Sequence, residues 1–288
     1  MPYRFRREET LGAGTRRIAR EIIDKTLSCL GDDSLPAEFK THEARKAVKR
    51  LRGLIRLVGP QVQSQSQFKS LDTALKKTGK QLAEARDRDV LRAILAEIAG
   101  EPEDSSGVAA DGPLKVATEV ERQRAFGQVM EELSNIQSDL GSLRLEGNGP
   151  EHIKPGYIET YRSSRKRMNK ALRTMSDAQL HRWREMVKYH SYHTNLVAGL
   201  DGGRLKDRRA NSQALEEVLG KHHDLAMLES HLKAQAKKKK LKKLNGVRLD
   251  ELRRRIRCTR RQTEREAERL GKTLFAEKPG KAEKNLPL

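Results

Sequence analysis

The stretch KTHEARKAVKRLRGLIRLVGP, from Lys40 to Pro60, combines seven Lys or Arg residues with an apolar residue at every third or fourth position. At about 100° per residue, this spacing gathers the apolar side chains on one side of a helix. That side comprises Ala44, Ala47, Val48, Leu51, Leu54, Ile55 and Val58. The opposite side carries a cationic set that we call the first stripe, made of His42, Arg45, Lys46, Lys49, Arg50, Arg52 and Arg56. The stretch therefore predicts a helix with one core side and one cationic side.

The first stripe is unfavourable for an isolated helix, because like charges at i and i+4 cost about 0.2–0.5 kcal/mol per pair. A face that serves only solubility normally mixes Glu among its cations, whereas Glu43 is the only acid between Lys40 and Pro60. The pattern favours a bound anion over a merely solvated face.

The composition points to the same class of partner. In 288 residues, 60 Lys and Arg stand against 40 Asp and Glu, giving a formal net charge of +20. Such an excess favours a polyanionic partner: nucleic acid, an anionic membrane surface or inorganic polyphosphate. A solubilising surface is the alternative. The low hydrophobic content (35%) and aromatic content (4%) suit long amphipathic helices with narrow apolar stripes.

Two further features concern the compartment. Cys29 and Cys258 are too few and too far apart for a disulfide framework, which predicts a reducing environment. The opening MPYRFRREETLGAG lacks the apolar run of a signal peptide, and no segment approaches the roughly 18 apolar residues of a membrane span. The sequence therefore predicts a soluble, cytoplasmic protein with no membrane partner.

Helical periodicity dominates the chain and predicts an all-α fold. The expected helices cover Glu9–Leu30, Lys40–Leu57, Gln67–Ala99, Leu114–Leu140, Tyr157–Thr174, Asp177–Leu200, Arg209–Lys239 and Arg248–Leu274. The loop LEGNGPEHIKPG divides an N-terminal half, residues 1–148, from a C-terminal half, residues 149–275. Residues 276–288 are expected to be a disordered tail.

The two halves share sequence motifs. HEARKAVK, His42–Lys49, and HRWREMVK, His181–Lys188, both read H-x-x-R-x-x-V-K at an offset of 139 residues. LAEARDRDV, Leu82–Val90, has a looser counterpart in LGKHHDLAM, Leu219–Met227, at an offset of 137 residues. Two motifs in the same order at nearly one offset indicate a duplicated helical unit. The second copy predicts a second stripe, made of His181, Arg184, Lys188 and Tyr192, which would face the first across a groove if the halves pack about a pseudo-twofold axis.

With these motifs, the chain resembles the CHAD family of conserved-histidine α-helical domains from about Tyr3 to Phe275. HEARKAVKRLR, the LAEARDRDV about forty residues later and the second H-x-x-R copy carry the resemblance, and YRSSRKRM, Tyr161–Met168, resembles the basic helix that opens the family's second half. The resemblance implies two four-helix bundles related by internal pseudo-twofold symmetry around a basic central groove. It also implies binding of inorganic polyphosphate and association with polyphosphate granules. The implied ligand-facing residues are the first stripe together with Arg162, Arg165, His181, Arg184, Lys188 and Tyr192.

The second half departs from the family pattern at two places. Ser191 stands where the family usually has an Arg just before the Tyr, and the segment ARDRD of the first half becomes HHDLA in the second. Both changes reduce the positive charge of the second half, so its share in anion binding is expected to be smaller.

Other acidic residues and histidines could in principle act in catalysis or metal binding, but structural roles explain them better. Asp87 and Asp89 are expected to orient the arginines of the neighbouring helix through charge-assisted hydrogen bonds, with a metal site or a general base as the alternative. HHD, His222–Asp224, has no third ligand at i+4, so no metal is expected there. The chain has no phosphate-binding glycine loop, nucleophile elbow or Cys–His pair. We therefore expect a binding protein without catalysis and without a cofactor.

Nucleic acid is the alternative partner. A second basic block, Lys237–Lys243 with Arg253–Arg261, is suited to weak RNA or DNA binding, although the chain has few aromatic side chains to stack on bases. Hydrolysis of polyphosphate or a triphosphate through Asp87, Asp89 or a metal ranks third.

Overall fold

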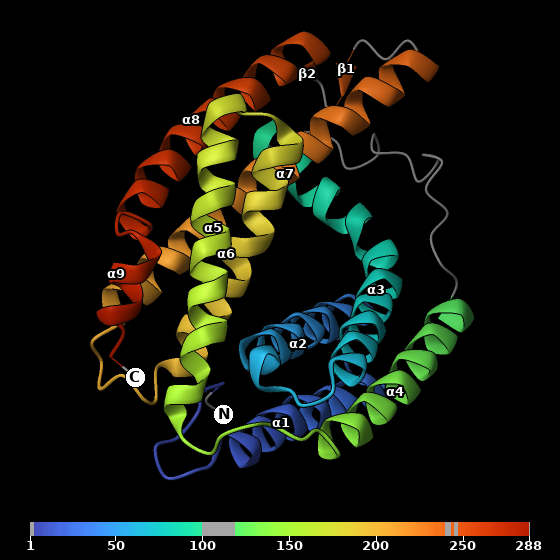
Figure 1. The fold of residues 1–288 in the computed structure, drawn as a ribbon. Helices are drawn as coiled ribbons and strands as arrows, with labels where there is room; N and C mark the ends of the chain where they lie inside the picture. The colour runs from blue at the N-terminus through green and yellow to red at the C-terminus, as the bar shows by residue number, and fades with distance from the viewer. Residues whose placement is uncertain (1–2, 100–118, 240–242, 245–246, 288) are drawn as a thin grey trace.

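The computed structural model describes residues 3–99, 119–239, 243–244 and 247–287, with side chains described outside 83–121, 150 and 235–247. The expected all-helical fold is confirmed (Figure 1). The helices of the first half are α1 (Leu11–Gly31), α2 (Ala37–Val58), α3 (Gln65–Ala99) and α4 (Glu119–Gly141). Those of the second half are α5 (Lys154–Thr174), α6 (Asp177–Val197), α7 (Lys206–Lys239), α8 (Leu249–Leu274) and α9 (Pro279–Lys284).

Short elements connect some of these helices. Two 3₁₀ turns, η1 (Gly59–Gln61) and η2 (Pro150–Ile153), follow α2 and precede α5. The strands β1 (Lys243–Leu244) and β2 (Val247–Arg248) form a small antiparallel hairpin between α7 and α8. Among the described residues, none of the helices combines the length and apolarity that crossing a membrane requires.

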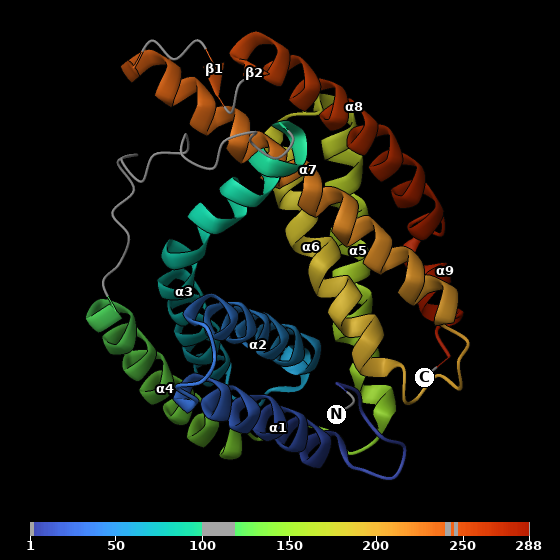
Figure 2. The same cartoon turned by 180° about the vertical axis from the view of Figure 1, so that it is seen from behind.

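The helices of each half pack mainly on one another. In the first half, α2 contacts α1 and α3, while α4 contacts α1 and α3. In the second half, α5, α6, α7 and α8 pack in sequence order (Figures 1 and 2). The main contacts between the halves are those of α2 with α6 and of α3 with α7, so α2 lies between the first-half helices and α6.

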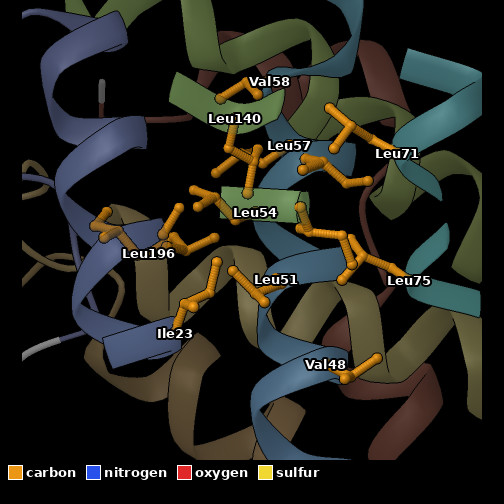
Figure 3. Packing of buried hydrophobic residues seen from close by; sticks show 14 of the residues in the cluster. Ile23, Val48, Leu51, Leu54, Leu57, Val58, Leu71, Leu75, Leu140 and Leu196 are labelled. Carbon is orange, nitrogen blue, oxygen red and sulfur yellow. The ribbon is translucent and has the colours of Figure 1, made fainter. Parts of the chain in front are cut away.

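Helix α2 supplies the centre of the larger hydrophobic core. Figure 3 shows its leucines pointing toward apolar side chains of α1, α3, α4 and α6. The labelled residues are Ile23, Val48, Leu51, Leu54, Leu57, Val58, Leu71, Leu75, Leu140 and Leu196. All are at most 1% exposed, and full burial of each such side chain contributes about 1.5–3 kcal/mol. The predicted core side of this helix is confirmed.

The expected disordered tail over residues 276–288 is wrong for the residues that the structure describes there. Pro279 occupies the first turn of α9, where its missing N–H costs no helical hydrogen bond. Ala282 and Leu286 are 4% and 6% exposed, and the Tyr161 hydroxyl donates a 2.9 Å hydrogen bond to the Glu277 carbonyl. Ala282 packs in the smaller core of the second half and Leu286 in the larger core, so these two apolar side chains anchor the segment to the folded protein.

Candidate functional site

Helices α2 and α6 approach closely at Gly53. A Cβ atom at this position would lie 2.9 Å from the Cβ of Tyr192, so only glycine fits without movement. His193 Nε2 donates a 2.9 Å hydrogen bond to the Gly53 carbonyl, and its Nδ1 lies 3.0 Å from the Thr160 hydroxyl. Burial lowers the pKa of His193 to about 3, so the ring is neutral. His193 of α6, to which the sequence assigned no role, therefore connects α6 to α2 through Gly53 and to α5 through Thr160.

One turn before this crossing on each helix, the side chains of Lys49 of α2 and Lys188 of α6 lie close together and line the same cavity. Burial, followed by the charges of Lys188 and Arg45, lowers the pKa of Lys49 to about 6. Burial and the charge of Arg184 also lower the pKa of Lys188, while Glu216 of α7 opposes this effect. The two lysines occupy equivalent positions in the repeated motif, so the fold brings the repeat copies together.

The Lys49–Lys188 pair lies in a cavity of about 760 Å³ between α2, α6 and α7, which we call the groove. Seven Lys or Arg side chains line it: Arg4, Lys46, Lys49, Arg50, Arg184, Lys188 and Arg209. His42 and Tyr192 also line it, as do two carboxylates, those of Glu216 and Glu217. Basic side chains therefore outnumber carboxylates by five in a concave site, and such an excess raises the local concentration of anions.

Arg52 and Arg56 of the first stripe do not line the groove. They contact the same carboxylate, Asp72 of α3, at 3.0 and 2.9 Å. Their guanidinium groups also lie 5.8 and 4.6 Å from the ring centre of Tyr189. Burial alone would raise the pKa of Asp72, but the hydrogen bond from Arg52 and the charge of Arg56 outweigh it and lower this pKa. Both arginines therefore share one carboxylate within the protein and lie outside the groove lining.

The two motif histidines differ in their surroundings. His42 lines the groove, with its Nε2 4.0 Å from Glu43. His181 lies outside the groove lining and packs on His223, with ring centres 4.5 Å apart and the Nδ1 atoms 3.2 Å apart. Arg45 donates a 3.3 Å hydrogen bond to the Leu82 carbonyl of α3 and acts on the groove through its charge beside Lys49.

The second-half arginines on α5 are not brought to the groove. Arg165 donates a 3.0 Å hydrogen bond to the Phe275 carbonyl, just past the end of α8. Arg162 is exposed and outside the groove lining. Asp87 and Asp89 lie in the part of α3 whose side chains fall outside those that the structure describes.

Sequence reasoning missed the contributions of α7 and of the N-terminal segment. Arg209, Gln213, Glu216 and Glu217 line the groove at spacings of about one and two turns, opposite the buried Leu215. That polar face was visible in the sequence, but no motif marked it.

The N-terminal segment reaches the groove through Tyr3. Its hydroxyl donates a 2.6 Å hydrogen bond to the Arg50 carbonyl, and the Arg50 guanidinium lies 5.5 Å from the centre of its ring. No charge pattern in the opening residues predicted this contact.

His222 and three arginines of the C-terminal basic block have acidic partners within the protein. His222 is 3% exposed and its Nε2 lies 3.2 Å from Glu264. Arg260 pairs with Glu229 at 2.5 Å and with Asp177. Across the described residues, no three His, Cys, Asp or Glu side chains gather as a metal site would require. In the block Arg253–Arg261, Arg254 and Arg255 also share the carboxylate of Glu251, while the side chains of Lys237–Lys243 lie outside the described set.

These features define an all-helical protein with a cation-lined groove where its two halves meet. The chain belongs to the CHAD domain family, whose model matches residues 32–233. The fold is similar to the crystal structure of the CHAD domain from the plant Ricinus communis, with a TM-score of 0.59 and 18% identity over 96% of this chain and 95% of that one. It is also similar to PptA from Streptomyces chartreusis, with a TM-score of 0.57 and 15% identity over 93% and 98% of the chains. No curated protein matches the sequence.

Proposed function

We propose that this protein binds inorganic polyphosphate in the groove and does not hydrolyse it. The observation that carries the proposal is the Lys49–Lys188 pair, in which two half-buried amines from different helices meet in a site lined by seven Lys or Arg side chains and only two carboxylates. Holding two amines together away from water is unfavourable unless an anion joins them. A phosphate between the amines would remove both the repulsion and the loss of solvation.

The groove chemistry suits a chain of phosphates. Arg184 and Arg50 offer planar guanidinium groups that donate two hydrogen bonds to one phosphate, whereas Lys46, Lys49 and Lys188 act as compact point charges. A polymer with one negative charge per phosphate can use several of these contacts at once. Glu216 and Glu217 repel anions on the α7 side, so we place the polymer along α2 and α6.

The proposal includes an architecture of two four-helix bundles related by a pseudo-twofold axis. The contact of Lys49 with Lys188 supports it, because equivalent residues of two copies meet when they lie near such an axis. The proposal also places the protein in the cytoplasm, at polyphosphate granules, as the resemblance to the family implies. Co-localisation of a fluorescent fusion with stained granules tests this location.

A pair of charge reversals tests the binding site. The double variant Lys49→Glu and Lys188→Glu changes two groove residues, and Lys166→Glu with Lys170→Glu makes the same change of charge on exposed residues of α5 outside the groove. With labelled long-chain polyphosphate at physiological salt, the groove variant should bind at least about a hundredfold more weakly, or about 2.7 kcal/mol. The α5 control should bind within about threefold of the wild type. Equal losses in both variants would mean that only net charge matters.

A further inference from the structure

Lys49 differs from a surface lysine in both position and neighbours. Its side chain lines the groove, so small solutes can reach it, yet it is half-buried between α2 and α6. The charged groups facing it are Arg45 on its own helix and Arg184 and Lys188 on α6, while Glu216 on α7 acts on Lys188. The described surroundings therefore place several cations around one amine.

This cluster has two consequences for reactivity. Repulsion and burial favour loss of the proton from Lys49, and a neutral amine is a nucleophile whereas an ammonium group is not. The guanidinium of Arg184 and the ammonium of Lys188 attract small anions to the same place. A reagent that is both a phosphate anion and an acyl donor meets both conditions.

We propose that Lys49 is a modification site that small acyl phosphates acylate within the groove. The phosphate group of the reagent lies against Arg184 and the Lys188 ammonium, so that the acyl carbon rather than the phosphate lies beside the Lys49 amine. The Nζ lone pair attacks this carbon and an N–C bond forms. The bond between the acyl carbon and the bridging oxygen then breaks, inorganic phosphate leaves with the electron pair, and the Nζ proton passes to solvent. The product is a neutral amide, and no oxidant or further reactant is needed.

Acylation would close the groove to polyanions, and this consequence rests on the proposed function. The amide can no longer take up a proton, so the groove loses a cation that it would otherwise present to a bound phosphate. The acyl group also occupies space at the point where α2 and α6 meet. Acylation would therefore couple the level of acyl phosphates to the binding capacity of the groove.

The direct test is site-resolved acetylation of the full chain by acetyl phosphate at pH 7. Mass spectrometry of proteolytic peptides gives the initial rate at each lysine, with the exposed Lys166 and Lys170 as internal controls. We expect Lys49 to react at least about tenfold faster than either control, because most of its amine is neutral at this pH. Excess pyrophosphate should suppress the reaction at Lys49 and leave both controls unchanged. Equal rates at Lys49 and the controls, or preferential acetylation of Lys188, would overturn the assignment.

The variant Lys188→Gln tests whether the neighbouring charge, and not only the accessibility of Lys49, sets its acetylation rate. Removing the neighbouring charge leaves Lys49 more protonated, so its acetylation at pH 7 should slow by about tenfold and recover toward the wild-type rate at pH 9. An unchanged rate at pH 7 would contradict the role of the pair. Polyphosphate binding by the acetylated protein is measured separately. Selective acetylation without loss of binding would refute the proposed function and leave the modification site intact.

Discussion

Lys49 should take up a proton when polyphosphate enters the groove. In the free protein its pKa is lowered to about 6 by burial and by Lys188 and Arg45, so at pH 7.5 most of the amine is uncharged. A phosphate beside Lys49 would raise this pKa toward its ordinary value of about 10.4. Each polymer bound across the pair should therefore bring about one proton onto the protein.

The sign of the pH dependence follows from that rise. Because binding raises the pKa of Lys49, the contribution of its proton to affinity is fully present below about pH 6 and is lost as the pH increases. Between pH 6 and 8 the affinity should fall by up to about a hundredfold, or about 2.7 kcal/mol, at fixed salt. Lys188, Arg184 and Arg45 favour release of the proton in the free state, and Glu216 acts against them through Lys188.

Two measurements check this prediction. Titration calorimetry in two buffers of different ionisation enthalpy gives the number of protons taken up, and fluorescence anisotropy gives the affinity from pH 5.5 to 8.5. The variant Lys49→Gln is the control, because it keeps His42 and every other titrating group of the groove. In a plot of the logarithm of the affinity against pH, we expect the slope of the variant to be shallower than that of the wild type by up to one. Equal slopes, or no difference in proton uptake, would refute the role given to Lys49.

Three further predictions concern stability and are checked by urea unfolding. Gly156→Ala should lower the free energy of unfolding by roughly 3 kcal/mol or more, because the new Cβ would lie 1.9 Å from the backbone oxygen of Leu57. An unchanged unfolding midpoint would contradict the close contact of α5 with α2. His190→Leu should raise the free energy of unfolding by roughly 1 kcal/mol, because both ring nitrogens are buried without a hydrogen-bond partner among the described residues; a loss of stability would indicate a hidden partner. Asp72→Asn should lower it by roughly 1–3 kcal/mol at pH 7, since the carboxylate of Asp72 joins two arginines. Its lowered pKa makes that contribution present above about pH 4 and lost as the pH falls further, so wild type and variant should converge in acid.

Most of the helical architecture was predictable because it depends on periodicity. The apolar side from Ala44 to Val58 is buried as expected, since a 3.6-residue repeat leaves little choice of which side faces the core. The repeat also identified Lys49 and Lys188 as equivalent residues, and they are the pair that meets in the groove. The tail was misjudged because Ala282 and Leu286 are too few to form a recognisable pattern.

The composition of the groove was predictable only in part, because helix angle does not fix which neighbour a cation meets. Arg52 lies on the same helix face as Lys49, yet it turns to Asp72, which no motif marked as its partner. Likewise, Arg165 matches the family's basic helix but bonds to the Phe275 carbonyl at the end of another helix. Such pairings depend on tertiary packing, which a single sequence does not encode locally.

The most direct test of polyphosphate binding in the groove is competition at fixed physiological salt. Labelled long-chain polyphosphate is displaced by unlabelled polyphosphate, duplex DNA or single-stranded RNA, from the wild type and from the Lys49→Glu, Lys188→Glu double variant. We predict that polyphosphate competes more than about tenfold better than either nucleic acid, or about 1.4 kcal/mol, and that the double variant loses this preference. Equal competition by nucleic acid, or an unchanged preference in the variant, would contradict the claim that the groove recognises polyphosphate.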